Sequence, residues 1–206
     1  RFALFPMPST FFESESPSER FYRLRSDRTA KCLAGRLPPE MHCTVSVDSG
    51  WTQAPGVTAG LDTLCNLLGR FCRHVSVVLP MAQRRHIDKD KLFAALKASD
   101  PFGEFSVVER TPDAELHLRL GARDGPDGTT IYWGFNGWCA FVSNSAHAGL
   151  SPQIESAVGA EMAACLAGAA AFRYWAERSI AGIMPFGVDV FNMGEVPFDV
   201  VADQPP

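Results

Sequence analysis

The chain has 206 residues, of which 46% are hydrophobic and 20% are charged, ordinary values for a folded protein with a sizeable core. A net charge of −4 argues against a nucleic-acid partner, since nucleic-acid-binding proteins usually carry a surplus of basic residues. No window reaches the run of about 18 apolar residues needed to span a membrane, so no membrane partner is expected.

The first 40 residues are expected to be an irregular extension. Its segment ESESPSER, at 13–20, is charged and rich in serine, which is typical of a mobile linker. The segment DRTAKCLAGRL, at 27–37, can form a short helix that begins at Asp27 and ends before Pro38.

Between residues 42 and 110, runs typical of buried strands alternate with runs whose apolar residues have helical spacing. Leu92, Phe93 and Leu96 are expected to share one face of the second helix. In chain order, the expected elements are a strand at 42–47, a helix at 58–74, a strand at 75–80, a helix at 88–101 and a strand at 104–110.

The later part of the chain predicts further strands and one long helix. Residues 114–120 alternate like a strand with one solvent-facing side. Residues 130–144 predict two strands joined at Asn136-Gly137, a strong hairpin dipeptide. The remaining elements are a long helix near 155–178 and strand-like stretches at 187–192 and 196–201.

Strands that alternate with helices predict an α/β fold built in layers. We expect a Rossmann-like, mixed and mostly parallel sheet flanked by helices. A late β-hairpin and a long alanine-rich helix complete it.

None of the six cysteines forms a C-x-x-C pair, and neither they nor the five histidines have zinc-ligand spacing, so no metal is expected. Most of the cysteines lie in apolar segments, where a free cysteine packs as a small hydrophobic residue. The apolar start RFALFPMPSTFF is broken by two prolines, unlike a signal peptide. We therefore expect a reduced, cytoplasmic protein.

The segment GAEMAACLAGAAAFRYW, at 159–175, is apolar on nearly all sides. It resembles the late helix of bacterial ThiF-type proteins, which are related to ubiquitin-activating enzymes. NGWCAFVS resembles the strand before that helix in defence-associated members, and LFAALKASDPFGEFSVVE resembles an earlier helix, turn and strand. Since the resemblance covers roughly residues 41–178, we expect 41–206 to form one ThiF-like domain. The helix residues that match in order are Gly159, Ala163, Ala164, Leu166, Ala167 and Phe172.

Active ThiF-type enzymes adenylate a carboxylate with ATP and magnesium, and a glycine-rich loop offers backbone N–H groups to the phosphates. The corresponding stretch of this chain is DSGWTQAPG, in which Gly50, Gly56 and the later Gly60 have the wrong spacing. Trp51 follows the first glycine directly, and Pro55 has no N–H to offer. The glycines therefore predict a degenerate nucleotide loop.

Two further parts of the implied nucleotide site are missing. Leu79 stands near the position of the acidic residue that would bind the ribose, and Gly121 near that of the aspartate that would hold magnesium. Arg84 and Arg85 are the only remnants of a phosphate-binding segment. The three departures together predict a pseudo-enzyme with no bound cofactor.

Cys139 has two interpretations. Activating enzymes often use a cysteine thiolate to take the carboxylate from AMP, and this resemblance makes Cys139 a candidate nucleophile. The alternative is a buried strand cysteine with a raised thiol pKa, the reverse of what thiolate chemistry needs. Because Cys139 lies in the strand-like run GWCAFV, the structural role is favoured.

Gly159, Ala163, Ala167 and Ala170 form a strip of small side chains on one side of the late helix. One side of this helix can pack on the domain's own sheet, whereas the other needs a second cover. We expect that cover to be another subunit, in a homo- or heterodimer, or else the phenylalanine-rich N-terminal segment.

Two functions follow from these patterns. The first is a catalytically inactive ThiF-like domain that serves as a scaffold or dimerisation partner of a related adenylating subunit. It would act in a bacterial ubiquitin-like conjugation system, including an antiphage one, or would bind a ubiquitin-like protein or the leader peptide of a peptide-modification system. The alternative is an active enzyme of another class on a Rossmann-like fold, with a small-molecule ligand at the carboxyl ends of the strands.

Overall fold

The computed structural model describes residues 15–33, 40–53, 56–121, 128–146, 156–183 and 185–196. The chain divides into two compact units, Arg1–Leu37 and Pro38–Pro206. No helix in these described ranges is long and apolar enough to cross a membrane.

The N-terminal unit contains the helix α1 (Pro17–Cys32). Its start is a capping box, because the Glu19 backbone N–H donates to Ser16 Oγ (3.2 Å) and the Ser16 N–H donates to Glu19 Oε2 (2.8 Å). Pro17 occupies the first helical position, where its missing N–H costs nothing. The expected linker at 13–20 and helix start at Asp27 are therefore wrong, since the serines and prolines of that segment begin a helix. Residues 34–39, with the expected helix end, lie outside the described residues.

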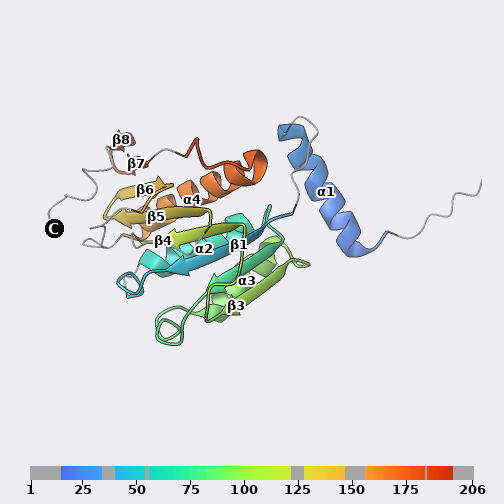
Figure 1. Ribbon diagram of the computed structural model, residues 1–206, viewed down its shortest axis with the longest axis horizontal. Helices are drawn as coiled ribbons and strands as arrows, with labels where there is room; N and C mark the ends of the chain where they lie inside the picture. Colours follow the sequence, from blue (N-terminus) through green and yellow to red (C-terminus); the bar gives the residue numbers. More distant parts are fainter. Residues whose placement is uncertain are drawn as a thin grey trace, which may run out of the picture. The chain divides into compact units, whose positions relative to one another are not determined.

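The second unit is built on a mixed sheet of eight strands (Figure 1), which confirms the expected α/β fold. The pairs among its first five strands in sheet order are parallel, and the pairs from β5 to β8 are antiparallel. In sheet order the strands are β3 (Glu104–Val108), β2 (His74–Val78), β1 (His42–Val47), β4 (Leu116–Leu120), β5 (Thr130–Asn136), β6 (Cys139–Ser143), β7 (Phe186–Asp189) and β8 (Gly194–Val196).

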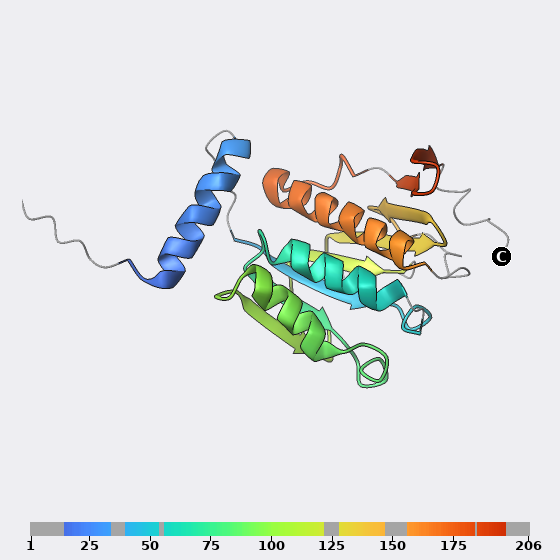
Figure 2. The ribbon, with the colours of Figure 1, turned by 180° about the vertical axis from the view of Figure 1, so that it is seen from behind.

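Three helices lie side by side over one face of this sheet (Figure 2). They are α2 (Gly56–Leu68), α3 (Lys89–Ser99) and α4 (Ala157–Glu177), with α2 in contact with both of the others. The face below them is apolar, because Val45, Leu118 and Ile131 are register partners on adjacent strands and all are fully buried. Burial of this face against the helices supplies the main driving force for folding.

The opposite face of the sheet carries polar side chains joined across the strands. Ser76 Oγ lies 2.9 Å from both His42 Nε2 and Ser106 Oγ, and Thr44 Oγ1 lies 2.6 Å from His117 Nδ1. His117 is buried, although residues 114–120 were expected to have a solvent-facing side. The expectation fails because β4 lies inside the sheet, between β1 and β5. Burial lowers the pKa of His117, so its ring is neutral at pH 7.

Two local expectations also need correction. Phe93 is exposed, whereas Leu92 and Leu96 are buried as expected. The late hairpin turns one residue later than its dipeptide suggested, since Asn136 still pairs with Cys139. The first turn residue is therefore Gly137, whose φ of 56° suits the glycine position of a tight hairpin turn.

The later elements confirm the expected order. Helix α4 begins after Ser156, whose side chain accepts a hydrogen bond from the Gly159 N–H (3.2 Å). The expected strand at 187–192 is present as the shorter β7, and β8 begins before the expected 196–201 stretch. Residues 197–201 lie outside the described residues.

Candidate functional site at the carboxyl edge of the sheet

The carboxyl ends of β1, β2 and β4 meet at one edge of the sheet, where Rossmann-like folds bind their ligands. Asp48 follows β1 directly, and its backbone N–H donates to Leu120 O (2.9 Å) at the end of β4. The carboxylate of Asp48 forms an ion pair with the guanidinium of Arg119, with side chains that are 4% and 21% exposed respectively. This edge of the sheet is therefore occupied by the protein's own buried ion pair, which the sequence analysis did not foresee.

Gly121 makes room for the Asp48 side chain. Its φ is 118°, in the region that favours glycine, and a Cβ at this position would lie 2.2 Å from Asp48 Oδ2. The resemblance to active enzymes places the magnesium-binding aspartate near Gly121. The space that a side chain would need there is instead filled by Asp48.

The loop between β1 and α2 is held by Trp51 rather than opened toward a ligand. The Trp51 ring is buried and packs edge-on against Phe135 of β5, with 5.2 Å between ring centroids. Its backbone N–H donates to Asp48 O (2.9 Å). A Cβ on Gly50 would meet no atom within 4 Å, so sterics do not require glycine there. Pro55 lies outside the described residues.

Gly56 and Gly60 have a packing role that their sequence context did not reveal. Added Cβ atoms would lie 2.8 Å from Ser156 O and 3.0 Å from Ala160 O respectively, both in or next to α4. The two glycines, one helical turn apart, thus let α2 approach the backbone of α4 closely. Their four-residue spacing, opposite the small residues of α4, is the signal that could have indicated this contact.

The segment after β2 closes over the same edge of the sheet. Leu79 is buried, and the buried side chain of Gln83 donates from Nε2 to Val47 O (2.9 Å) at the end of β1. Arg84 is half-buried, donates from Nε to Leu79 O (3.1 Å) and approaches Glu109 (3.6 Å). Arg85 is exposed. Of the two arginines considered as phosphate-binding remnants, Arg84 is therefore engaged in holding its own loop.

Cys139, the candidate nucleophile, is buried at the start of β6. Burial raises the pKa of its thiol, and the nearby Asp189 carboxylate raises it further. A raised pKa reduces the thiolate fraction at neutral pH, so this environment favours the structural role.

We expect Cys139→Ser to destabilise the domain by about 1–3 kcal/mol, because it places a hydroxyl in a buried apolar position. Urea unfolding followed by circular dichroism measures the change. Ala140→Ser, at the neighbouring buried position of the same strand, is the matched control and should cost a similar amount. A stable Cys139→Ser protein that accumulates an oxyester with a ubiquitin-like protein would contradict the structural role.

The strip of small residues on α4 lies inside the domain. Gly159, Ala163, Ala167 and Ala170 are all buried in the single chain, where α4 packs against α2, β5 and β6. The expected role of this strip as a contact with a second subunit is therefore wrong. The reason is that α2 and the sheet together cover two sides of the helix.

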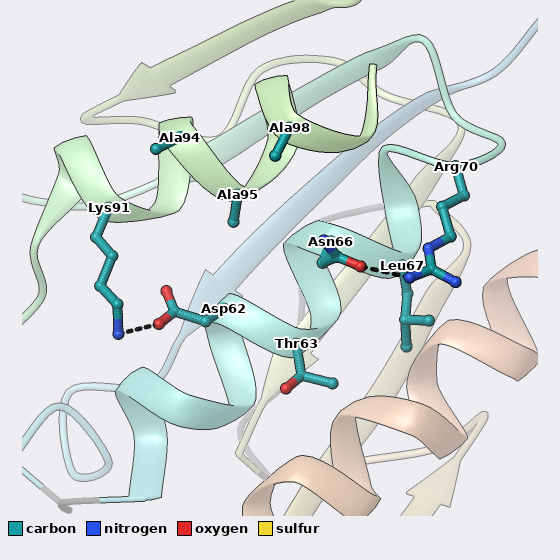
Figure 3. Close-up of a pocket in the computed structure, with 9 residues that line it drawn as sticks. All are labelled: Asp62, Thr63, Asn66, Leu67, Arg70, Lys91, Ala94, Ala95 and Ala98. Carbon is teal, nitrogen blue, oxygen red and sulfur yellow. Dashed lines mark hydrogen bonds and ion pairs between the residues drawn. The ribbon is translucent and has the colours of Figure 1, made fainter. Parts of the chain in front are cut away.

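A groove of about 610 Å³ lies between α2 and α3, on the helical layer rather than at the strand ends (Figure 3). The Asp62–Lys91 ion pair lies at one end, and Arg70 donates to Asn66 Oδ1 (2.9 Å) at the other. Three alanines of α3 form one wall. Within the described ranges no three His, Cys, Asp or Glu side chains are placed to hold a metal ion.

The sheet topology and the three helices define a class, the ThiF-type adenylating fold, and solved structures of that class match it. MccB of E. coli with ATP is 9% identical over 89% of this chain and 71% of its own, with a TM-score of 0.54. The microcin C7 biosynthetic enzyme MccB with N-formylated MccA is 10% identical over 87% and 73%, with a TM-score of 0.55. PaaA is 10% identical over 92% and 76%, with a TM-score of 0.54.

Identities this low establish the fold alone. Residues 42–190 match the family model described as the BilD N-terminal domain, which spans well over half of the chain. The chain therefore belongs to the BilD N-terminal domain family. Comparison with curated protein sequences gave no match.

Proposed function

We propose that this chain is a catalytically inactive ThiF-like domain that pairs with a related, active adenylating subunit. It would serve as a scaffold or dimerisation partner in a bacterial ubiquitin-like conjugation system, including one used against phage, or in a peptide-modification system. A ubiquitin-like protein or a leader peptide would be the molecule that the assembled partners handle.

The observation that carries this proposal is the state of the strand ends. The Asp48–Arg119 pair, the Trp51 ring and the Gln83 side chain take up the edge where a Rossmann-like enzyme holds its phosphates. A buried carboxylate at this position would also repel phosphate, and its arginine partner is already paired. The same edge therefore supports a role in partner contacts more than a role in nucleotide chemistry.

The family and the solved structures support the class of partner. MccB has been crystallised with ATP and, separately, with the peptide MccA, so one protein of this fold binds both kinds of ligand. Membership of the BilD N-terminal domain family relates this chain to the same superfamily. We retain the peptide or ubiquitin-like partner for the assembly and assign the ATP to the related subunit.

We also propose a cytoplasmic location. The cysteines whose side chains the structure describes form no disulfide, and three of them, Cys43, Cys65 and Cys72, lie in the buried core. Burial raises the pKa of Cys65 to about 12, so this thiol resists oxidation through its thiolate. Buried, unpaired cysteines are common in reducing compartments.

ATP is the ligand that tests the proposal. We expect 1 mM ATP with magnesium to leave the melting temperature of the chain unchanged. A site with a dissociation constant of about 10 μM would instead add about 2.7 kcal/mol of stability, which is roughly 5–10 °C for a domain of this size.

MccB serves as the positive control for this measurement, since it has been crystallised with ATP. Calorimetric titration of the chain should give no heat beyond dilution under conditions in which MccB binds. A dissociation constant in the low micromolar range for this chain would refute the proposed inactivity.

A further inference from the structure

Large apolar side chains are exposed where the last two β-turns of the domain meet, at the carboxyl edge of the sheet. Trp138 is 48% exposed in the turn between β5 and β6, and Phe191 and Met193 are 74% and 79% exposed in the turn between β7 and β8. We call these three residues the apolar tip. Val158, in the first turn of α4, is also exposed, and the adjacent Gly159 packs against Gly137 O of the first turn.

The two turns are joined into one rigid surface. The Val190 N–H donates to Trp138 O (2.9 Å), and the Trp138 and Phe191 rings pack edge to face at 5.9 Å. The Asp189 carboxylate accepts from the Phe191 N–H (2.9 Å), which holds the second turn with Phe191 outward. Clusters of exposed aromatic and methionine side chains on a fixed support are typical of protein-binding sites.

Charge narrows the kind of partner that the apolar tip fits. The sequence contains no Lys or Arg at 128–172 or at 183–196, whereas Glu161, Asp189 and Glu195 lie on α4, β7 and β8. The tip therefore has an apolar centre in a region whose only formal charges are negative. A complementary partner presents apolar side chains flanked by basic ones.

One described segment of this chain has that composition. Helix α1 contains five Lys or Arg and two Asp or Glu, which gives a net charge of +3 from 5 − 2. Arg20, Arg23 and Leu24 are exposed, and their i, i+3, i+4 spacing puts them on one face of the helix. This face combines an apolar side chain with two basic neighbours.

We propose that the apolar tip of one copy binds the Arg20–Leu24 face of α1 from a second copy, so that two chains exchange their N-terminal helices. The second copy is favoured because α1 joins the domain through residue 42, at the amino end of β1, whereas the tip lies at the opposite edge of the sheet. This inference deepens the proposed function, since it names a surface through which copies of the chain associate.

Sedimentation of the full chain tests the proposal. At about 100 μM and low salt, the wild type should be a dimer, and Phe191→Asp with Met193→Asp should weaken association by at least about tenfold. Arg20→Glu with Arg23→Glu should weaken it similarly. Adding Glu161→Lys and Glu195→Lys to the α1 variant should restore dimers, because the charge pairs are re-formed in reverse. Phe93→Asp, on α3 and away from the tip, is the matched control and should remain dimeric.

All substituted positions are exposed, so each variant should keep the far-ultraviolet dichroism and melting temperature of the wild type. A monomeric wild type would overturn the proposal, whether the tip is bare or covered by its own α1. A dimer that survives the tip variant, or one lost through the tip but indifferent to the α1 charges, would also overturn it. None of these results affects the ATP measurement, so the two proposals can fail separately.

Discussion

Gly159→Ala is expected to destabilise the domain by about 2–4 kcal/mol, although alanine is the better helix former. A Cβ at Gly159 would lie 2.1 Å from Gly137 O, a backbone atom that cannot move without displacing the β5–β6 turn. Helix propensity alone predicts a gain of about 1 kcal/mol for this exposed-looking alanine-rich segment. The clash must therefore reverse the sign, by pushing α4 away from β5 and opening the core.

Urea unfolding measures this effect, and a fall of about 1–2 M in the midpoint is expected for a domain with an ordinary denaturant slope. Gly168→Ala on the same helix is the matched control. Its Cβ would meet the end of the flexible Leu67 side chain at 2.9 Å, so the change should stay within about 1 kcal/mol. A Gly159→Ala protein as stable as the wild type would show that the close approach of α4 to the hairpin turn is unimportant.

Asp48→Ala is expected to cost about 2–4 kcal/mol of stability, because it leaves the Arg119 guanidinium mostly buried without its counter-charge. The loss is somewhat smaller than for a fully buried pair, since Arg119 is 21% exposed and water can reach part of it. Arg119→Met should cost a similar amount. The double variant should lose less than the sum, with a coupling of about 1–3 kcal/mol.

Asp62→Ala provides the comparison for a surface pair. Its Lys91 partner is 59% exposed, so water replaces the lost interaction and the cost should be below about 1 kcal/mol. Urea unfolding at pH 7 and one ionic strength compares all four proteins. If Asp48→Ala costs no more than Asp62→Ala, the strand-end pair is not a structural element, and the site loses its main reason for being closed.

Local pattern was enough to predict most of the sheet and helix order. The alternation at 42–47 and the helical spacing of leucines in α2 are set by which face each side chain must bury, and this information lies within a few residues. The same logic located α3 between Asp88 and Asp100, since a capping carboxylate and a proline mark its ends. It failed for α1, because a serine- and glutamate-rich stretch suggests a linker until its capping box is recognised.

The candidate site shows a different division. The sequence by itself determined that a phosphate loop of the usual spacing is absent, because glycine spacing and the position of Trp51 can be read directly. Only the tertiary structure decided what replaces it. The pairing of Asp48 with Arg119 joins residues far apart in the chain, and it exists because β1 and β4 are neighbours in the sheet.

The glycines divide in the same way. Their positions along the chain are plain, but the atoms that exclude a side chain at Gly56, Gly60 and Gly159 belong to distant segments. Sequence spacing therefore suggested a nucleotide loop and a subunit interface, whereas packing assigns these residues to contacts of α2 and α4 within one chain. A glycine required by close approach is specified by the partner surface, and that surface forms only when the chain has folded.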